Sequence, residues 1–161
     1  MTDAGSASGC FFCAAVAGAD EPLLVAGDPA TITVLNRFPY NSGHLMVAPR
    51  AHLSDLLAAG DDGAAALMVA ARRAMRALES AMHPAGFNLG VNHGDAAGAS
   101  IDHLHLHVVP RWGGDTNFMP VLGATKVLPE LLEETAARLR HAFAELADVP
   151  EPAELPPAQR L

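Results

Sequence analysis

Three histidines stand at every second position of the segment IDHLHLHVVPRW, residues 101–112. Because side chains alternate between the two faces of a β-strand, an extended backbone would place His103, His105 and His107 on one face. The apolar residues between them would then point into a core. Successive rings would stand about 6.5–7 Å apart at the backbone, whereas a zinc–nitrogen bond measures about 2 Å. The spacing therefore disfavours a single metal ion held by all three histidines.

Imidazole rings in such a row are suited to chemistry on phosphorus. A neutral ring has a pKa of about 6.5, so a usable fraction carries a free lone pair at neutral pH. The attacking ring needs a hydrogen bond at its other nitrogen, and a neighbouring histidine can bind phosphate oxygens or protonate the leaving group. The alternative is a histidine-rich exposed face, or core histidines with satisfied hydrogen bonds. Strict alternation of three rings favours the catalytic interpretation.

Short β-branched runs predict the strands that would carry this row. Residues 31–35 (TITVL) predict one strand, and residues 44–48 (HLMVA), closed by Pro49, predict a second. The segment between them, NRFPYNSG, is rich in turn residues, so the two strands are expected to pair as antiparallel neighbours. Residues 87–92 (FNLGVN) predict a further strand, and the loop HGDAAGAS leads from it to the histidines.

Two longer segments predict helices. In residues 61–82, apolar side chains recur at three- or four-residue spacing, and Pro84 and Gly86 end the pattern. Residues 128–146 predict a final amphipathic helix, with Pro129 in its first turn. Strands joined by tight loops, with two helices set apart from them, are typical of an antiparallel sheet in an α+β fold.

The length and charge of the chain limit its organisation and partners. Its 161 residues suit one domain, which we expect at residues 10–146, between a flexible N-terminus (1–9) and a disordered Pro/Glu-rich tail (147–161). The net charge of −8 and the single lysine, Lys126, argue against nucleic acid and anionic membranes as partners, since both need a basic surface. The chain also lacks a basic signal segment and a long uncharged apolar run, so we predict a cytoplasmic protein.

The only two cysteines, Cys10 and Cys13, are spaced as Cys-x-x-Cys. In a cytosolic chain this spacing indicates a metal-binding or redox pair rather than a structural disulfide. The two residues by themselves leave these alternatives open.

Residues 103–109 (HLHLHVV) match the pattern His-φ-His-φ-His-φ-φ, in which φ is an apolar residue. By this motif the chain resembles the histidine triad (HIT) superfamily over about residues 10–146. The segments NRFPYNSGHLMVAPR and HLHLHVVPRWGGDTNF are most similar to its bacterial diadenosine polyphosphate hydrolase and phosphorylase branch, which is related to the fragile histidine triad proteins. The resemblance implies an α+β HIT-like fold, an antiparallel sheet of about five strands with two main helices.

The resemblance also implies roles for the histidines and for one asparagine. His105 would be the nucleophile that becomes nucleotidylated, and His107 would bind the phosphate and assist departure of the leaving group. His103 would orient the site rather than carry a proton, and His44 would lie behind the triad in a supporting network. Asn36 would lie near the ribose, on the opposite wall of the cleft.

The loop before the triad would bind the phosphate chain through Asn92 and Ser100, with the backbone of Gly98 close by. Hydrolase-like relatives usually have Gly-Gln-Ser/Thr at this place, where the present chain has Gly98-Ala99-Ser100. Phosphorylase-like relatives have a small middle residue, which leaves room for inorganic phosphate in place of water. Ala99 is also small, although the phosphorylase-like relatives have glycine at this position. The size of this residue therefore favours phosphorolysis and leaves hydrolysis open.

Many bacterial triad proteins pair the Cys-x-x-Cys motif with two histidines that bind a structural zinc ion. The matching positions are His52, in the segment PRAH, and His103. Together with Cys10 and Cys13 they would form a closed tetrahedral set, which suits structural rather than catalytic zinc. The resemblance thus implies structural zinc that fastens the N-terminus to the sheet, and no organic cofactor.

The function implied is cleavage of a nucleotide phosphoanhydride, with diadenosine tetraphosphate as substrate and water or inorganic phosphate as acceptor. A nucleoside phosphoramidase and an adenylyl-sulfate hydrolase would use the same residues, whereas the acidic chain argues against a DNA-adenylate hydrolase. A different class is a non-catalytic protein that binds adenine nucleotides. Proteins of this superfamily are commonly dimers, so a homodimer is expected.

Overall fold

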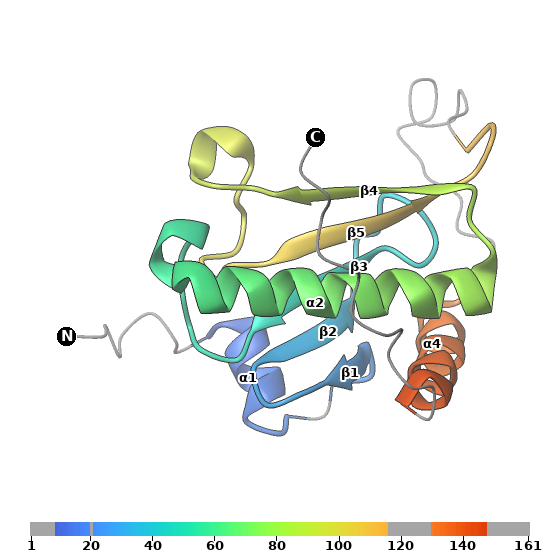
Figure 1. Ribbon diagram of the computed structural model, residues 1–161, viewed down its shortest axis with the longest axis horizontal. Helices are drawn as coiled ribbons and strands as arrows, with labels where there is room; N and C mark the ends of the chain where they lie inside the picture. Colours follow the sequence, from blue (N-terminus) through green and yellow to red (C-terminus); the bar gives the residue numbers. More distant parts are fainter. Residues whose placement is uncertain (1–8, 20, 116–129, 148–161) are drawn as a thin grey trace, which may run out of the picture.

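A five-stranded antiparallel sheet, in the order β1-β2-β3-β5-β4, forms the centre of the protein (Figure 1). The structure is a computed structural model that describes residues 9–19, 21–115 and 130–147. The strands are β1 (Leu24–Gly27), β2 (Thr31–Leu35), β3 (Leu45–Pro49), β4 (Gly86–Val91) and β5 (Leu106–Arg111). The helices are α1 (Phe11–Val16), α2 (Leu56–Met82), the short 3₁₀ turn η1 (Asp95–Ala97) and α4 (Leu132–Ala147). The predicted α+β fold, with about five strands and two main helices, is confirmed.

The register of the central strands places the last triad histidine. β2 and β3 pair along their whole length, and every residue of both strands is buried. β5 lies between β3 and β4, so that His107 stands opposite Met46 on one side and Gly90 on the other. A Cβ atom added at Gly90 would meet no atom within 4 Å, so the sheet surface beside His107 is open.

The two long helices pack on the sheet and on each other. α2 contacts β2, β3 and β5, while α4 packs against α2 and β1 (Figure 1). Asp55 caps the start of α2 by accepting a hydrogen bond from the Ala58 amide at 2.9 Å. The helix ends at His83, which takes the left-handed conformation (φ 49°) and donates its backbone N–H to Glu79. No helix among the described residues is both long enough and apolar enough to cross a membrane.

The predicted boundaries agree with the structure in part. The helix predicted at residues 61–82 is confirmed within α2, which begins earlier, at Leu56, and is interrupted by the non-helical Gly60 (φ 64°, ψ 178°). β5 begins only at Leu106, so the prediction of one strand through all three histidines is wrong, because His103 and His105 lie in the segment before it. α1 and β1 were not predicted. The first residues of the predicted final helix, 128–129, and most of the two predicted terminal segments (1–8 and 148–161) lie outside the described residues, so the domain limits stay a prediction.

Gly43, in the loop before β3, lies close to the C-terminal end of α2. A Cβ atom there would stand 2.7 Å from Met82 Sδ and 2.9 Å from Leu78 Cδ2, and φ is +80°. Replacing Gly43 by alanine should therefore lower the free energy of unfolding by about 2–4 kcal/mol, through backbone strain and overpacking. Urea denaturation measures this loss. Gly86→Ala, at a position with open space and no positive φ, is the control, and equal stability of the two variants would contradict the prediction.

Candidate active site

A row of aromatic rings from four parts of the chain crosses the candidate site. Phe12 of α1 lies 5.5 Å from the ring of His105, and His105 lies 4.8 Å from His107 of β5. His107 is followed at 5.1 Å by His44, which precedes β3, and His44 stacks at 4.8 Å on Tyr40 of the loop between β2 and β3. Two triad histidines and the predicted supporting histidine are thus in direct contact.

Hydrogen bonds determine the position of the proton on two of these rings. His44 Nδ1 lies 3.0 Å from the backbone N–H of Tyr40, which can only donate, so the proton of neutral His44 is on Nε2. That Nε2 donates to His107 Nδ1 at 2.9 Å, which leaves the His107 proton on Nε2. His107 Nε2 is buried and has no hydrogen-bond partner among the described residues. It is a donor available to a ligand.

The environment keeps His107 neutral. Burial lowers the pKa of its ring, and the neighbouring His105 lowers it further. The groups that face it are the rings of His44, His105 and Tyr40. A neutral His107 at physiological pH is the state that the hydrogen-bond chain requires.

A hydrogen bond to a backbone carbonyl determines the tautomer of His105. The ring is buried, and its Nδ1–H donates to the backbone carbonyl of His103 at 2.7 Å. Its lone pair therefore lies on Nε2, which is the arrangement that a nucleophilic imidazole needs.

Asn36, at the start of the loop between β2 and β3, contacts His44 at its end. Its backbone N–H donates to the carbonyl of His44 at 2.8 Å, and its side-chain Nδ2 lies 3.4 Å from His44 Nδ1. Its Oδ1 accepts a hydrogen bond from the Phe38 amide at 2.9 Å. The structure thus brings Asn36 to the supporting histidine.

The residues expected to hold phosphate lie in the loop between β4 and the triad. Asn92 Nδ2 donates to the carbonyl of Gly98 at 3.4 Å, across the η1 turn. Gly98 has φ 84°, a left-handed conformation that favours glycine at this point. Ser100 is exposed at the end of the loop. The loop therefore brings Asn92 and Gly98 together, and it presents Ser100 to solvent ahead of the histidines.

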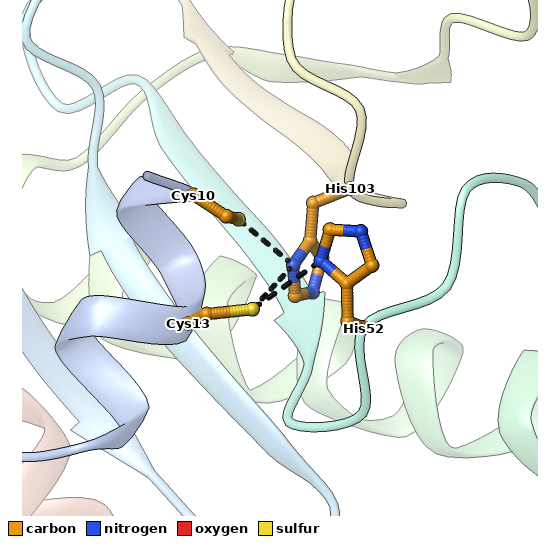
Figure 2. A group of neighbouring side chains, drawn as sticks. All are labelled: Cys10, Cys13, His52 and His103. Atoms are coloured by element: carbon orange, nitrogen blue, oxygen red, sulfur yellow. Dashed lines mark hydrogen bonds between the residues drawn. The ribbon is translucent and has the colours of Figure 1, made fainter. Parts of the chain in front are cut away.

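A second cluster contains the two cysteines (Figure 2). Cys10 immediately precedes α1 and Cys13 lies one turn later, so both thiols lie on the same side of the helix. His52 follows β3 and His103 precedes β5, and one donor atom from each of the four residues lies within 4.8 Å of the others. All four predicted ligands are brought together, and the cluster could hold a metal ion.

The ring of His103 is in the state that metal binding needs, and the thiols would have to lose their protons. His103 Nε2–H donates to the carbonyl of Pro49 at 2.9 Å, so the lone pair of the ring is on Nδ1. That Nδ1 lies 3.3 Å from Cys10 Sγ and 3.7 Å from Cys13 Sγ, and His52 Nδ1 lies 3.3 Å from Cys13 Sγ. Burial is the main cause that raises the pKa of the Cys13 thiol, and the hydrogen bond with Cys10 raises it further. A bound cation would lower this pKa again, because it favours the thiolate.

His103 belongs to both clusters. Its ring faces the thiols, while its backbone carbonyl accepts the hydrogen bond from His105 Nδ1. The position of the cysteine–histidine cluster and the orientation of the buried His105 ring are therefore linked through one residue.

Sequence reasoning missed three groups that set this geometry: the amide of Tyr40, the carbonyl of Pro49 and the ring of Phe12, which lies against His103 and His105. Two of these are backbone groups, whose role carries no residue-type signal. The sequence leaves two roles open for Phe12: an apolar residue of the core, or one that lines an apolar pocket for an adenine ring.

Comparison with known proteins agrees with this geometry. The model of the HIT domain matches residues 20–114. An AP-4-A phosphorylase of Mycobacterium tuberculosis is 45% identical over 126 residues, which are 78% of this chain. The match spans 65% of that relative, slightly less than two thirds of its length.

Two solved structures have the same architecture. A Zn-bound histidine triad family protein from Mycobacterium smegmatis is 31% identical with a TM-score of 0.74, over 88% of this chain and 97% of that protein. A hypothetical histidine triad nucleotide-binding protein from Sulfolobus tokodaii is 28% identical with a TM-score of 0.72, over 85% of this chain and 93% of that protein. The family model, the relatives and the arrangement of the histidines lead to one conclusion: the chain belongs to the HIT family.

Proposed function

We propose that the protein cleaves diadenosine tetraphosphate, or a similar dinucleoside polyphosphate, by transferring a nucleotidyl group to His105. The observation that carries this proposal is the hydrogen bond from His105 Nδ1 to the carbonyl of His103, which leaves the lone pair on Nε2. The similarity to an AP-4-A phosphorylase supports the choice of substrate.

In the first step, His105 Nε2 attacks the phosphorus next to one adenosine. A phosphorus–nitrogen bond forms, and the bond to the bridging oxygen breaks, so that the electron pair leaves with ATP. ATP departs as an anion, and His107 Nε2–H stabilises the departing oxygen by a hydrogen bond. The nucleotidylated ring is a cation that keeps its Nδ1 proton, which remains hydrogen-bonded to the carbonyl of His103.

In the second step, an oxygen of inorganic phosphate attacks the same phosphorus, the phosphorus–nitrogen bond breaks, and ADP is released. The electron pair returns to His105 Nε2, which restores the starting state. Water as acceptor would give AMP and a proton instead. The small side chain of Ala99, in the loop before the triad, favours phosphate as the acceptor because it leaves room for the larger nucleophile.

The remaining predicted residues bind the substrate in this proposal. Asn92, the backbone of Gly98 and Ser100 hold the phosphate chain, and the hydrogen bond between Asn92 and the Gly98 carbonyl supports their grouping. Asn36 lies at the ribose side and also contacts His44, which orients His107.

We further propose that the metal of the cysteine cluster is zinc, held by Cys10, Cys13, His52 and His103. Two sulfur and two nitrogen donors suit tetrahedral zinc, and four protein ligands leave no open position for a substrate. The Zn-bound relative from Mycobacterium smegmatis supports this choice. Zinc would act structurally, by holding α1 and the His103 ring in place.

Analysis of the products tests the proposed function. The purified protein is incubated with diadenosine tetraphosphate, with and without inorganic phosphate, and the nucleotides are separated by chromatography. Formation of ADP and ATP only when phosphate is present is the expected result, whereas ATP and AMP would mean hydrolysis. If no product forms while AMP still binds, the protein is a nucleotide-binding protein and the proposal is wrong.

A homodimer and a cytoplasmic location stay predictions. β4 supports the first, because it is an edge strand of the sheet and its Leu89 side chain is 41% exposed. A second copy of the chain could cover this edge.

A further inference from the structure

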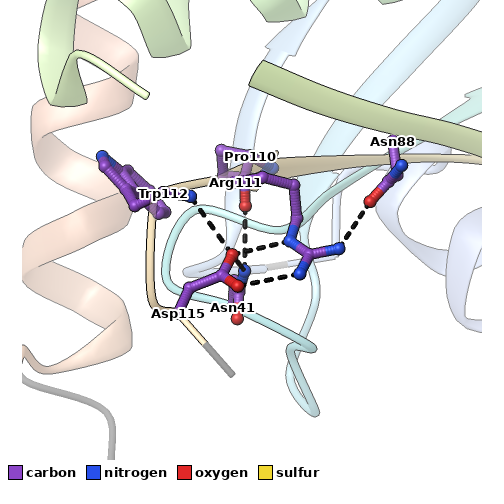
Figure 3. A network of polar contacts seen from close by, with 6 residues as sticks. All are labelled: Asn41, Asn88, Pro110, Arg111, Trp112 and Asp115. Atoms are coloured by element: carbon purple, nitrogen blue, oxygen red, sulfur yellow. Dashed lines mark hydrogen bonds and ion pairs between the residues drawn. The ribbon is translucent and has the colours of Figure 1, made fainter. Parts of the chain in front are cut away.

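A polar cluster lies where β5 ends, outside the row of rings (Figure 3). It joins β4, the end of β5, the turn that follows β5 and the loop between β2 and β3. We call it the Asp115 clasp. Its members are Asn41, Asn88, Arg111, Asp115 and the backbone N–H of Trp112.

Arg111 and Asp115 form the centre of the clasp. The guanidinium donates from Nε to Asp115 Oδ2 at 2.6 Å and from Nη2 to Oδ1 at 2.8 Å, which is a bidentate pair. Nη1 donates to Asn88 Oδ1 of β4 at 2.7 Å, and the Trp112 amide donates to Asp115 Oδ2 at 3.1 Å. The hydrogen bonds from Arg111 hold the pKa of Asp115 well below its usual range, so the carboxylate is ionised at neutral pH.

Asn41 connects this pair to the active site. Its Nδ2 donates to Asp115 Oδ2 at 2.7 Å and to the carbonyl of Pro110 at 3.0 Å. Its own carbonyl accepts the backbone N–H of His44 at 3.1 Å, so Asn41 and His44 are the first and last residues of one turn. The same segment contains Tyr40, whose amide determines the tautomer of His44.

Two side chains of the loop near Asn41 are largely open to solvent: Phe38 is 82% and Tyr40 59% exposed, although the Tyr40 ring stacks on His44 and Pro39 is buried. On the other side of the turn, Gly43 rests against α2. The clasp therefore supplies the polar contacts that fix the start of the turn relative to β5, the strand that carries His107.

We propose that Asp115 is a positioning residue for the reaction at His105: through Asn41 it holds the turn that presents His44 to His107. This inference rests on the proposed function. In it, the clasp keeps the His44 Nε2–H aimed at His107 Nδ1, and so keeps the His107 proton on the nitrogen that faces the leaving oxygen. Asp115 acts through other residues and does not itself touch the reacting atoms.

The variants Asp115→Asn and Asn41→Ala test the proposal. Each should lower kcat about tenfold, because displaced catalytic groups lose alignment, and should change KM less than about twofold. The double variant should lose no more than the worse single variant, because the two residues act as one unit.

The control is Asp28→Asn, at the opposite end of β2 from this loop. Asp28 also pairs with an arginine, Arg73, at 3.5 Å, and it also accepts backbone hydrogen bonds, so its loss measures the general effect of removing such a carboxylate. It should lower the melting temperature without lowering kcat. Equal loss of kcat in Asp28→Asn and Asp115→Asn at 25 °C would overturn the positioning role.

Histidine-selective proton–nitrogen correlation NMR gives a second measurement that needs no turnover. In the wild type, His107 should show the neutral form with its proton on Nε2, and in Asp115→Asn this signature should shift or become mixed. An unchanged His107 signature in Asp115→Asn would overturn the proposal. If the wild type cleaves no dinucleoside polyphosphate, the proposed function fails, and the NMR comparison still decides whether the clasp positions His44 and His107.

Discussion

His105→Asn is expected to lower kcat for diadenosine tetraphosphate by on the order of 10⁶-fold, since removal of a covalent nucleophile has an effect of this size in a well-studied case. Asparagine places an amide near the position of Nδ1, so the hydrogen bond to the His103 carbonyl and the shape of the site should be kept. Binding of AMP, measured by calorimetry, should therefore change little. The rate is measured by chromatography of the products.

His141→Asn is the control for this variant, because His141 is exposed on α4 and pairs only with Glu145 among the described residues. It should behave as the wild type. A trapping experiment completes the test: after brief exposure to labelled substrate and denaturation in alkali, the nucleotide should be attached to His105 in the wild type and absent from His105→Asn. Turnover of His105→Asn within about tenfold of the wild type would refute the covalent mechanism.

Loss of the proposed zinc ion should have the largest effect on stability. Cys13→Ser removes one of four donors, so the purified variant should contain far less than one zinc ion per chain. A metal at 1,000 times its dissociation constant stabilises the folded state by about 4 kcal/mol, and its loss should lower the melting temperature by about 10 °C. Zinc content is measured by mass spectrometry of the element, and unfolding by circular dichroism.

Ala14→Ser is the matched control, because it adds a hydroxyl group to an exposed position of α1 and leaves all four donors in place. It should keep its zinc and its melting temperature. A strong chelator should destabilise the wild type and Ala14→Ser but not Cys13→Ser. Wild-type protein that contains no zinc after purification, or that keeps its melting temperature in chelator, would contradict the zinc site.

The sequence predicted the elements whose local pattern is strong. The β-branched run at residues 31–35 coincides with β2, and the apolar repeat in residues 61–82 lies within α2. The six residues of α1 and the four of β1 were missed, since such short segments form through tertiary contacts: Phe12 and Val25 are buried in the common core. β5 begins only at Leu106 because the two residues at 103–104 form hydrogen bonds outside the sheet. His103 Nε2 donates to the carbonyl of Pro49, and the backbone N–H of Leu104 donates to the carbonyl of Leu53.

For the candidate site, the chemistry was predictable from residue types and the orientations were not. Histidines, cysteines and the loop residues could be selected from their spacing and from the HIT motif. The tautomers of His44, His105 and His107 depend on amides and carbonyls that any residue supplies. The Asp115 clasp joins residues 41, 88 and 111–115, and only the pairing of the strands brings these segments together.

The group behind the proposed nucleophile is a peptide carbonyl rather than an acidic side chain. A full negative charge in that place would bind a cationic ring more strongly than a neutral oxygen does. The nucleotidylated intermediate would then lie lower in free energy, and the activation free energy of the second step would be higher. The partial charge of a carbonyl oxygen aligns the ring without strongly stabilising its cationic form. This suits a nucleophile that must accept and release a nucleotidyl group in every turnover.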